Sequence, residues 1–284
     1  MIGPTPLPTK AREAAPWGLR TGVMLIVLLV VLVIVGPVLW SVDPTYESIA
    51  GLSPLGEPLE AGSEGYPLGS DPKGRDLLAR LLFAGRLTLL TALVSVGIAT
   101  AAGLLIGLVA ANTRRLAGSV LMRFTDLGLA IPGLLLAAAI ATILGRGTLS
   151  LVVGLAAVFW APIARVTYGQ AIVLKERDYV EAAHVMGGGM ATILVRHIMP
   201  HLLPVVAAYA ALTVGWAVLF ESALGFLGAG VQEPDASIGS MLGSYLVYYR
   251  SHPGLILFPA IFLGLLVLAA NLVGESLRTR TEER

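Results

Sequence analysis

The sequence predicts an all-α, polytopic membrane protein with six transmembrane helices. Of the 284 residues, 56% are hydrophobic and only 13% are charged, whereas a soluble domain carries about 25% charged residues because it must solvate its whole surface. In addition, several stretches of the roughly 20 residues that a helix needs to cross a bilayer contain no Asp, Glu, Lys or Arg. We therefore expect lipid to be the solvent for most of the chain.

The positions of these uncharged stretches define the six spans. A Gly-Arg-Gly turn around Arg146 divides one long stretch into a third and a fourth span. The apolar run of the first span is longer than the core of a typical signal peptide, so we expect it to remain as an anchor. The spans lie at about 21–42, 87–113, the two sides of Arg146 within 127–164, 198–220 and 255–274.

The distribution of lysine and arginine predicts the orientation. If the N-terminus is cytoplasmic, 13 of the 19 Lys and Arg residues lie in segments inside the cell and 6 lie outside, as the positive-inside rule requires. The tails 1–20 and 276–284 are then cytoplasmic, as is the segment between spans four and five. The polar segment 43–86 is then extracytoplasmic, and the core of five helices spans 87–275.

Composition also excludes several functions. The net charge of +1 gives no reason to expect a nucleic-acid partner. With no cysteine, thiolate catalysis and Cys-based metal sites are excluded. The three lysines follow Thr, Pro and Leu, so the Gly-Lys of a P-loop is absent, and His197 and His201 lack the H-E-x-x-H pattern. We expect no catalytic residue, no cofactor and no metal.

The segment between spans four and five predicts two short helices joined by a turn. Asp178 and Glu181 have the spacing of a capping box, which favours a helix start there. Gly187 suits the left-handed position that ends a helix. A second helical stretch, 191–197, is expected to stop at Pro200. An ordinary amphipathic loop explains these residues equally well on physical grounds alone.

The same segment, within 170–199, resembles the cytoplasmic loop of bacterial ABC-importer permeases, whose pattern is E-A-A, three residues, G, nine residues, x-I-x-P. Glu181-Ala182-Ala183, Gly187 and the stretch from His197 to Pro200 match that pattern. In that family the loop is a coupling helix that docks on the cytoplasmic ATPase. The resemblance implies that this contact and its turn are formed by Tyr179, Glu181, Ala182, Ala183, His184 and Gly187. Two further glycines follow Gly187, a departure that predicts a looser hinge.

Two other segments narrow the resemblance. Residues 66–76, Y-P-L-G-S-D-P-K-G-R-D, are similar to the P-L-G-T-D-x-x-G-R-D segment of dipeptide, oligopeptide and nickel permeases. Residues 221–230 resemble the E-x-x-L-S-F-L-G-x-G pattern of that class, with Gly225 in place of Ser. The likeness runs from about residue 15 to the end and is nearest to the second, C-type permease. Motif residues expected to be structural are Gly69, Asp71, Gly74, Arg75, Asp76, Pro200 and Gly228.

The resemblance implies a type I ABC-importer permease fold in the bacterial plasma (inner) membrane. The chain would form half of a translocation pathway for di- or oligopeptides, with nickel or another small solute as the alternative. Its implied partners are a second permease in a heterodimer, two P-loop ATPases, an extracytoplasmic solute-binding protein and the lipid bilayer. ATP hydrolysis would occur in the ATPases, so this chain would not be an enzyme.

Two rival functions are disfavoured by missing residues. An ion-coupled secondary transporter usually carries several ionisable groups near the membrane midplane, and the central parts of these spans carry almost none. An intramembrane enzyme would need a cysteine, an H-E-x-x-H motif or paired aspartates, and the spans provide none of these.

Several further residues in or next to the spans are candidates for a role. Glu221 lies near the outer end of span five, where a buried carboxylate is costly. We expect it either to line a pore or gate together with Phe226, or to hold the following glycine-rich turn by a hydrogen bond. The GxxxG pair at 103–107 predicts close helix packing, within the bundle or at a subunit interface. Asp126, beside Arg123, is expected in an interfacial ion pair.

Overall fold

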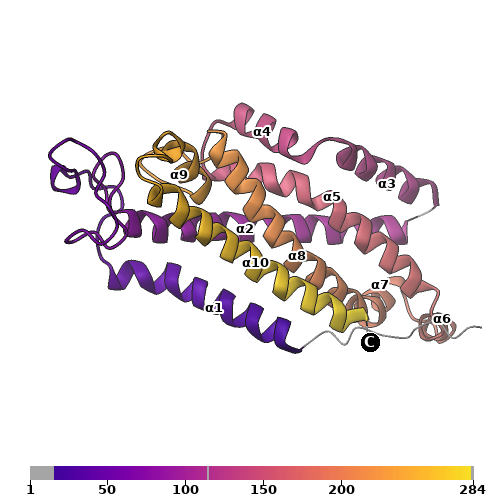
Figure 1. Ribbon diagram of the computed structural model, residues 1–284. Helices are drawn as coiled ribbons and strands as arrows, with labels where there is room; N and C mark the ends of the chain where they lie inside the picture. The colour runs from indigo at the N-terminus through magenta and orange to yellow at the C-terminus, as the bar shows by residue number, and fades with distance from the viewer. Residues whose placement is uncertain (1–15, 114, 283–284) are drawn as a thin grey trace, which may run out of the picture.

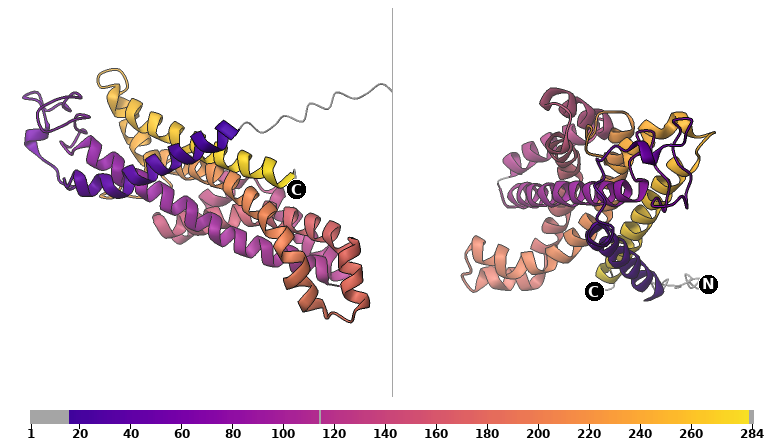
Figure 2. Two further views of the ribbon diagram at one scale, coloured as in Figure 1. Left: turned by 90° about the horizontal axis from the view of Figure 1, so that it is seen from below. Right: turned by 90° about the vertical axis from the view of Figure 1, so that its left-hand side faces the viewer.

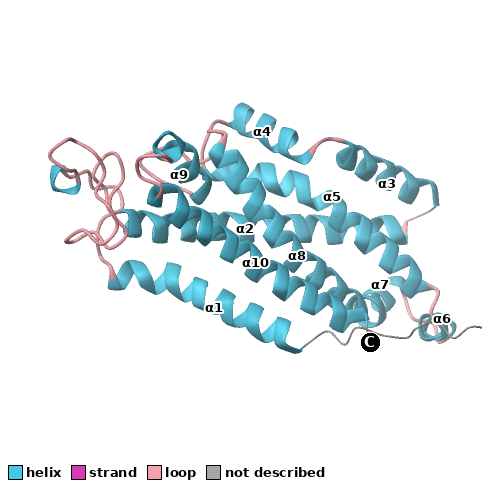
Figure 3. Ribbon diagram, in the orientation of Figure 1, coloured by secondary structure: helices cyan, strands magenta, loops and turns pink. Residues whose placement is uncertain are grey.

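The computed structural model describes residues 16–113 and 115–282, and within them every regular element is a helix (Figure 1). Helices dominate the bundle, whereas loops gather at one end of it (Figure 3). The helices are α1 (Pro16–Leu39), η1 (Ile49–Gly51), α2 (Leu77–Asn112), α3 (Arg115–Ala130), α4 (Gly133–Leu144), α5 (Thr148–Lys175), α6 (Asp178–Val185), α7 (Met190–Ile193), the π-helix η2 (Leu194–Ile198), α8 (Met199–Phe226), α9 (Ile238–Tyr245), η3 (Leu246–Tyr248) and α10 (Gly254–Glu282).

The number of spans agrees with the sequence only if one span is broken. Within the described residues, five helices are long and apolar enough to cross a membrane. A sixth crossing appears when α3 and α4, which meet at an angle of 87°, count as one. The break falls at Ile131 and Pro132 because proline has no amide hydrogen and disfavours a helical residue before it. The expected turn between spans three and four is confirmed at Gly145, where φ is 86°.

Two helices extend further than the stretches expected from the sequence. Helix α2 begins at Leu77 rather than 87, because Asp76 caps it and the charge of Arg80 is paired inside the protein. The second cytoplasmic stretch does not stop at Pro200, since α7 and η2 continue into α8. Pro200 is tolerated because it lies in the first turn of α8, directly after the π turn.

Helix α2 lies at the centre of the bundle and makes its most extensive contact with α5. At Gly103 an added Cβ would lie 2.7 Å from the carbonyl oxygen of Trp160, and at Gly107 it would lie 2.6 Å from that of Ala164. Only glycine allows the two backbones to approach so closely. The prediction that the 103–107 pair packs within the bundle is therefore confirmed.

The two ends of the bundle carry different segments (Figures 1 and 2). One end, here called the α9 end, carries the loop 43–76 and α9. The opposite end, here called the α6 end, carries α6, α7, the first turn of α1 and the last turn of α10. The helical termini of the chain therefore lie on the same side of the bundle, as the six-span prediction requires.

Candidate functional site

At the α6 end, α6 rests on a small apolar core of its own. Val180 and Ala183, three residues apart on one helix face, are 1% and 4% exposed and pack against Ile193 and Ile198. These four side chains form a cluster of their own, which meets the main core of the bundle through Leu174 and Leu194. Ala183, which the resemblance assigned to the ATPase contact, thus points into this small core.

The opposite face of α6 is open. Glu181, Ala182 and His184 are exposed, and the apolar side chains of Val185 and Met186 are 84% and 81% exposed. Sequence inspection missed these last two residues, although an apolar pair directly before a helix-ending glycine could have revealed them.

Tyr179 is partly exposed at the base of α6, where its ring lies 5.4 Å from that of His201 on α8. Beside this pair a groove of about 900 Å³ separates the end of α5 from the start of α8.

The turn after α6 is built as expected, but its start is not. Gly187 has φ +81°, and the amide of Gly188 donates to the carbonyl of Ala183 at 3.0 Å, which closes the helix. The predicted capping box is wrong: Arg177 precedes the helix and no side chain caps it. Asp178 and Glu181 instead lie in the first turn, where negative charge favours the helix dipole.

At the α9 end, Asp71 anchors a buried ion cluster. Its Oδ1 accepts hydrogen bonds from the amides of Lys73 and Arg75, and its Oδ2 lies 2.6 Å from Nε of Arg75. Oδ2 also accepts from the hydroxyl of Tyr245 at 3.2 Å and lies 3.4 Å from Nε of Arg80. Asp71, Arg75, Arg80 and Tyr245 are at most 4% exposed. Burial raises the pKa of Tyr245, which keeps its hydroxyl protonated as a donor to Asp71.

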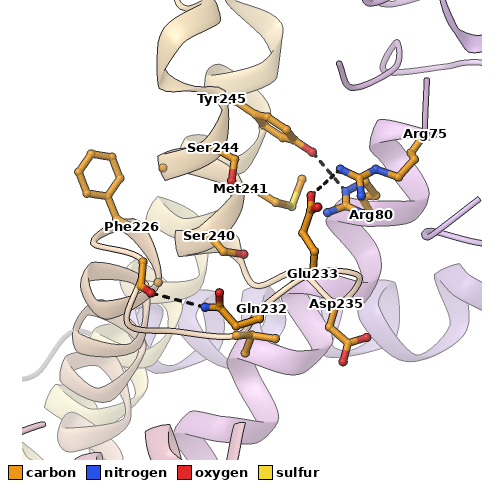
Figure 4. Close-up of a pocket in the computed structure, with 14 residues that line it drawn as sticks. Arg75, Arg80, Phe226, Gln232, Glu233, Asp235, Ser240, Met241, Ser244 and Tyr245 are labelled. Carbon is orange, nitrogen blue, oxygen red and sulfur yellow. Dashed lines mark hydrogen bonds and ion pairs between the residues drawn. The ribbon is translucent and has the colours of Figure 1, made fainter. Parts of the chain in front are cut away.

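Glu233, in the loop between α8 and α9, connects this cluster to the surface (Figure 4). Its carboxylate forms ion pairs with Lys73 and with Nη2 of Arg75, the latter at 3.2 Å. Those two cations, Lys73 first, lower the pKa of Glu233. The loop before α2 and the loop before α9 are thus joined by charge, although their residues are about 160 positions apart in the sequence.

The remaining motif residues of this end shape the backbone. Gly69 and Gly74 have φ +84° and +73°, and an added Cβ at Gly74 would lie 2.0 Å from the carbonyl oxygen of Ser48. Asp76 Oδ1 accepts from the amide of Ala79 at 2.7 Å and so caps α2. Gly228, with φ +76°, ends α8. These placements agree with the expected structural role of the motif.

Glu221 is completely buried, near the hydroxyl groups of Ser237, Thr88 and Ser222. It lies where α8 meets the start of α9, and the amide of Ile238 donates to Thr88 at 3.2 Å. The carboxylate therefore lies inside the chain, between α8 and the start of α9. Phe226 is 44% exposed and borders a cavity of about 270 Å³ beside the ion cluster.

Asp126 forms an ion pair, but its partner is Arg165 on α5 and not the neighbouring Arg123. Nη2 of Arg165 lies 2.5 Å from Oδ1 of Asp126. The two side chains are 47% and 36% exposed, so the pair lies on the surface of this chain.

Comparison with known proteins identifies the family. Residues 103–284 match the family described as binding-protein-dependent transport system inner membrane component. The di/tripeptide transport system permease protein DppC of Pseudomonas aeruginosa is 36% identical over 261 residues, which cover 92% of this chain and 86% of that protein. The chain belongs to this family of inner membrane transport components.

Two other relatives of this transport component are also named as permease proteins of transport systems. The oligopeptide transport system permease protein OppC of Haemophilus influenzae is 38% identical over 220 residues, covering 76% of this chain and 70% of that protein. The glutathione transport system permease protein GsiD of Pectobacterium atrosepticum is 35% identical over 219 residues, covering 77% and 73%.

A solved structure shows the same fold as this transport component. A chain of the inward-facing MetNI methionine ABC transporter superposes with a TM-score of 0.60 at 20% identity, covering 72% of this chain and 96% of that one. The predicted type I importer permease fold is therefore confirmed, and the chain is a multi-pass membrane protein.

Proposed function

We propose that this chain is a permease subunit of an ATP-driven importer of di- or oligopeptides. The family membership and the names of the relatives, which concern dipeptides, tripeptides, oligopeptides and glutathione, support a peptide substrate. The chain forms half of a translocation pathway and pairs with a second, different permease chain. An extracytoplasmic solute-binding protein delivers the peptide to the α9 end.

Two P-loop ATPases bind at the α6 end, which is cytoplasmic together with both termini of the chain. The observation that carries this assignment is the exposed face of α6, where the side chains of Val185 and Met186 are each more than four fifths exposed. Apolar side chains exposed to this degree at the end of a charged helix are typical of a docking contact. Glu181, Ala182 and His184 surround them and give the contact its polar rim.

The small apolar core beneath α6 supports a role in transmission. Because Val180 and Ala183 pack on Ile193 and Ile198, which lie just before α8, a displacement of α6 would be passed to the start of α8. Closure of the ATPase dimer would then displace α8, which runs without a break from η2 to Phe226. The chain itself performs no chemistry, since ATP is hydrolysed by the partner subunits.

The test is co-purification from native membranes in mild detergent. Val185→Glu places a charge in the proposed contact, and we expect the two ATPases to be lost while the second permease is retained. Val195→Glu is the matched control, because Val195 is also strongly exposed, at 64%, at the same end but outside α6. Retention of the ATPases by the Val185→Glu variant would contradict the assignment of α6.

The substrate is tested by ATP-dependent uptake in vesicles that contain the whole complex. We expect a labelled dipeptide to accumulate only with ATP and in the presence of the binding protein. Uptake of Ni²⁺ that dipeptides do not inhibit would overturn the peptide assignment. Uptake without ATP would overturn the importer itself and support a secondary transporter.

A further inference from the structure

The backbone leading into α8 departs from regular α-helix geometry. Helices α7, η2 and α8 form one continuous helical run, Met190–Phe226, but its second part, η2, is a π turn. There the amide of Met199 donates to the carbonyl of Leu194, five residues back, whereas an α-helix bonds four residues back. Single π turns inside α-helices occur frequently at functional sites, so this turn is a candidate for a functional element.

The packing of α6 gives a reason for the π turn. Ile193 and Ile198 are five positions apart, yet both are at most 1% exposed and both pack on Val180 and Ala183 of α6. A regular α-helix brings residues three or four apart onto one face, whereas a π turn closes over five residues. The extra residue therefore turns both isoleucines toward α6, and the π turn is part of the contact that holds that helix.

Two prolines weaken the backbone directly after the π turn. Pro200 and Pro204 both lie inside the continuous helical run and supply no amide hydrogen. Sharp bends in helices occur mainly at prolines and at π turns, and here all of these lie within residues 194–204, called the hinge segment from here on. Both prolines are exposed and border the groove of about 900 Å³ between α5 and α8, which leaves the segment room to bend.

The hinge segment also lies at the boundary between two packing units. Ile198 is the last buried residue of the cluster beneath α6, whereas Leu202, one turn later, is the first residue of α8 in the main core. Both side chains are completely buried. Leu174 and Leu194, which touch both units, are only partly buried. A bend between 198 and 202 can therefore move α6 and its cluster while the packing of the main core is kept.

His201, inside the hinge segment, contacts α6 directly. Its Nδ1 lies 3.0 Å from the carbonyl oxygen of His197. Because a carbonyl oxygen can only accept, this nitrogen carries the hydrogen and donates it. The centre of the imidazole ring lies 5.4 Å from that of Tyr179 on α6. A tilt of α6 is therefore passed to a side chain that is itself fixed to the backbone of the hinge segment.

We propose that residues 194–204 form a hinge on which α6 and its apolar cluster turn against the rest of α8, and that His201 is the positioning residue that holds α6 to this hinge. The inference rests on the proposed function, because the ATPases drive the movement. Helix α6 has to keep its contact with the ATPase in both states of the ATPase dimer while it stays attached to α8. A hinge at a few helix-terminal residues allows both, because it absorbs the change in angle.

The prolines provide the first test, in vesicles that contain the whole complex. Pro200→Ala combined with Pro204→Ala restores two amide hydrogens and stiffens the helix. We expect the number of dipeptides taken up per ATP hydrolysed to fall about tenfold, within the range over which changes along a coupling element act, while the thermal midpoint does not fall. Pro259→Ala is the matched control, because Pro259 lies five residues after the start of α10 as Pro204 lies five residues after the start of α8.

Removal of the π turn is the second test. Deletion of Val195, which is 64% exposed, leaves Ile193 and Ile198 four positions apart, so both still face α6 in a regular α-helix. We expect the same loss of about tenfold in uptake per ATP, with the ATPases still co-purifying. Val195→Ala keeps the extra residue and should behave as the native chain does. Native uptake per ATP in both stiffened proteins would overturn the hinge, and the proline variant decides alone if the deletion protein does not assemble.

The role of His201 is tested by the same ratio of uptake to ATP hydrolysis. His201→Ala removes the ring that contacts Tyr179 and should lower the ratio about fivefold, whereas His201→Phe keeps a ring there and should restore it. His197→Ala is the control, because only the backbone carbonyl of His197 takes part in the contact. A His201→Ala protein with a lower thermal midpoint and an unchanged ratio would show that His201 only stabilises the fold.

Hydrogen exchange separates the hinge from the proposed function. In the purified complex, a non-hydrolysable ATP analogue should change the exchange rate over 194–204 by at least about tenfold and leave the rate over 215–225 unchanged. Unchanged exchange over 194–204 would overturn the hinge even where ATP drives dipeptide uptake. If the exchange changes but ATP drives no dipeptide uptake, the hinge stands and the assignment as a peptide importer fails.

Discussion

At the α9 end, the loop before α2 is tied to α9 through buried charges, whereas at the α6 end a cluster of four apolar side chains, two of them from α6 itself, holds that helix. The single carboxylate of Asp71 interacts with Arg75, Arg80 and Tyr245, all of them buried. The α6 cluster consists of apolar side chains alone and meets the main core through two partly buried leucines, Leu174 and Leu194. Charge networks fix a single arrangement because each member needs its partners, whereas a small apolar contact can shift as a unit. The structure therefore combines a braced end with a movable one.

The largest effect is expected from breaking the brace. Asp71→Ala leaves Arg75 and Arg80 buried without their shared carboxylate, which costs about 3–5 kcal/mol. The thermal midpoint of the purified protein should fall sharply and α9 should become accessible to protease. Glu47→Ala is the control, because Glu47 is 56% exposed and pairs at the surface with Lys73 and with Arg75, so its removal should cost less than about 1 kcal/mol. Similar losses in both variants would show that burial of the cluster does not matter.

A smaller effect is expected at the movable end, and it should stay local. Ile193→Ala removes a side chain that is 1% exposed beneath α6, with a cost of about 2–5 kcal/mol to the docking of that helix. Hydrogen exchange should increase over 176–193 but not over α2 or α9. Exchange that increases across the whole bundle would show that α6 is part of the main cooperative unit.

The sequence predicted the helices well where hydropathy alone decides. It failed where distant residues or backbone breaks decide. The early start of α2 depends on the cap formed by Asp76 and on Arg80, which is paired inside the protein with Asp71 and with Tyr245, 165 positions away. The uncharged stretch, in contrast, begins only after Arg86. Pro132 was visible as a breaker of span three, but a search for uncharged stretches does not register it.

The candidate site was predicted in the same uneven way. The E-A-A pattern located α6 and its closing glycine, because both depend on local sequence. Which face of α6 is buried depends on Ile193 and Ile198, in the helical stretch that follows it, so the pattern alone could not show that Ala183 is buried. Likewise the motif at 66–76 identified Asp71 and Arg75, but not Glu233, which reaches them from another loop.

Two glycines with nearly the same φ compare the ends directly. Gly74 has φ +73° and Gly187 has φ +81°, so alanine at either position costs about 1–2 kcal/mol for the left-handed backbone. At Gly74 the new Cβ would also overlap Ser48, whereas at Gly187 nothing lies within 4 Å. Thermal unfolding should therefore show Gly74→Ala to be less stable than Gly187→Ala by about 1–3 kcal/mol, the usual cost of overpacking. Equal thermal midpoints of the two variants would mean that the loop 43–76 can rearrange at little cost and does not hold the α9 end rigidly.

Acid provides the mildest test of the braced end, because it removes the exposed ion pairs of Glu233. Lys73 and then Arg75 lower the pKa of Glu233 from its ordinary value of 4.5. The ion pairs of Glu233 are therefore fully formed above the unfolded value and are lost as the pH falls through the lowered folded value. Glu233 is 53% exposed, so solvent screening limits the effect to less than about 1 kcal/mol.

Between about pH 5 and pH 3, the accessibility of the 227–237 loop to protease should rise in the native chain more than in Glu233→Gln, whose loop is already released at pH 5. The same protease assay at α6 should show no difference between the two proteins, since the cluster beneath α6 contains no titratable side chain. If the protease accessibility of Glu233→Gln changed with pH as that of the native chain does at both ends, Glu233 would contribute nothing to the brace. Asp71 would then be the group that holds the α9 end.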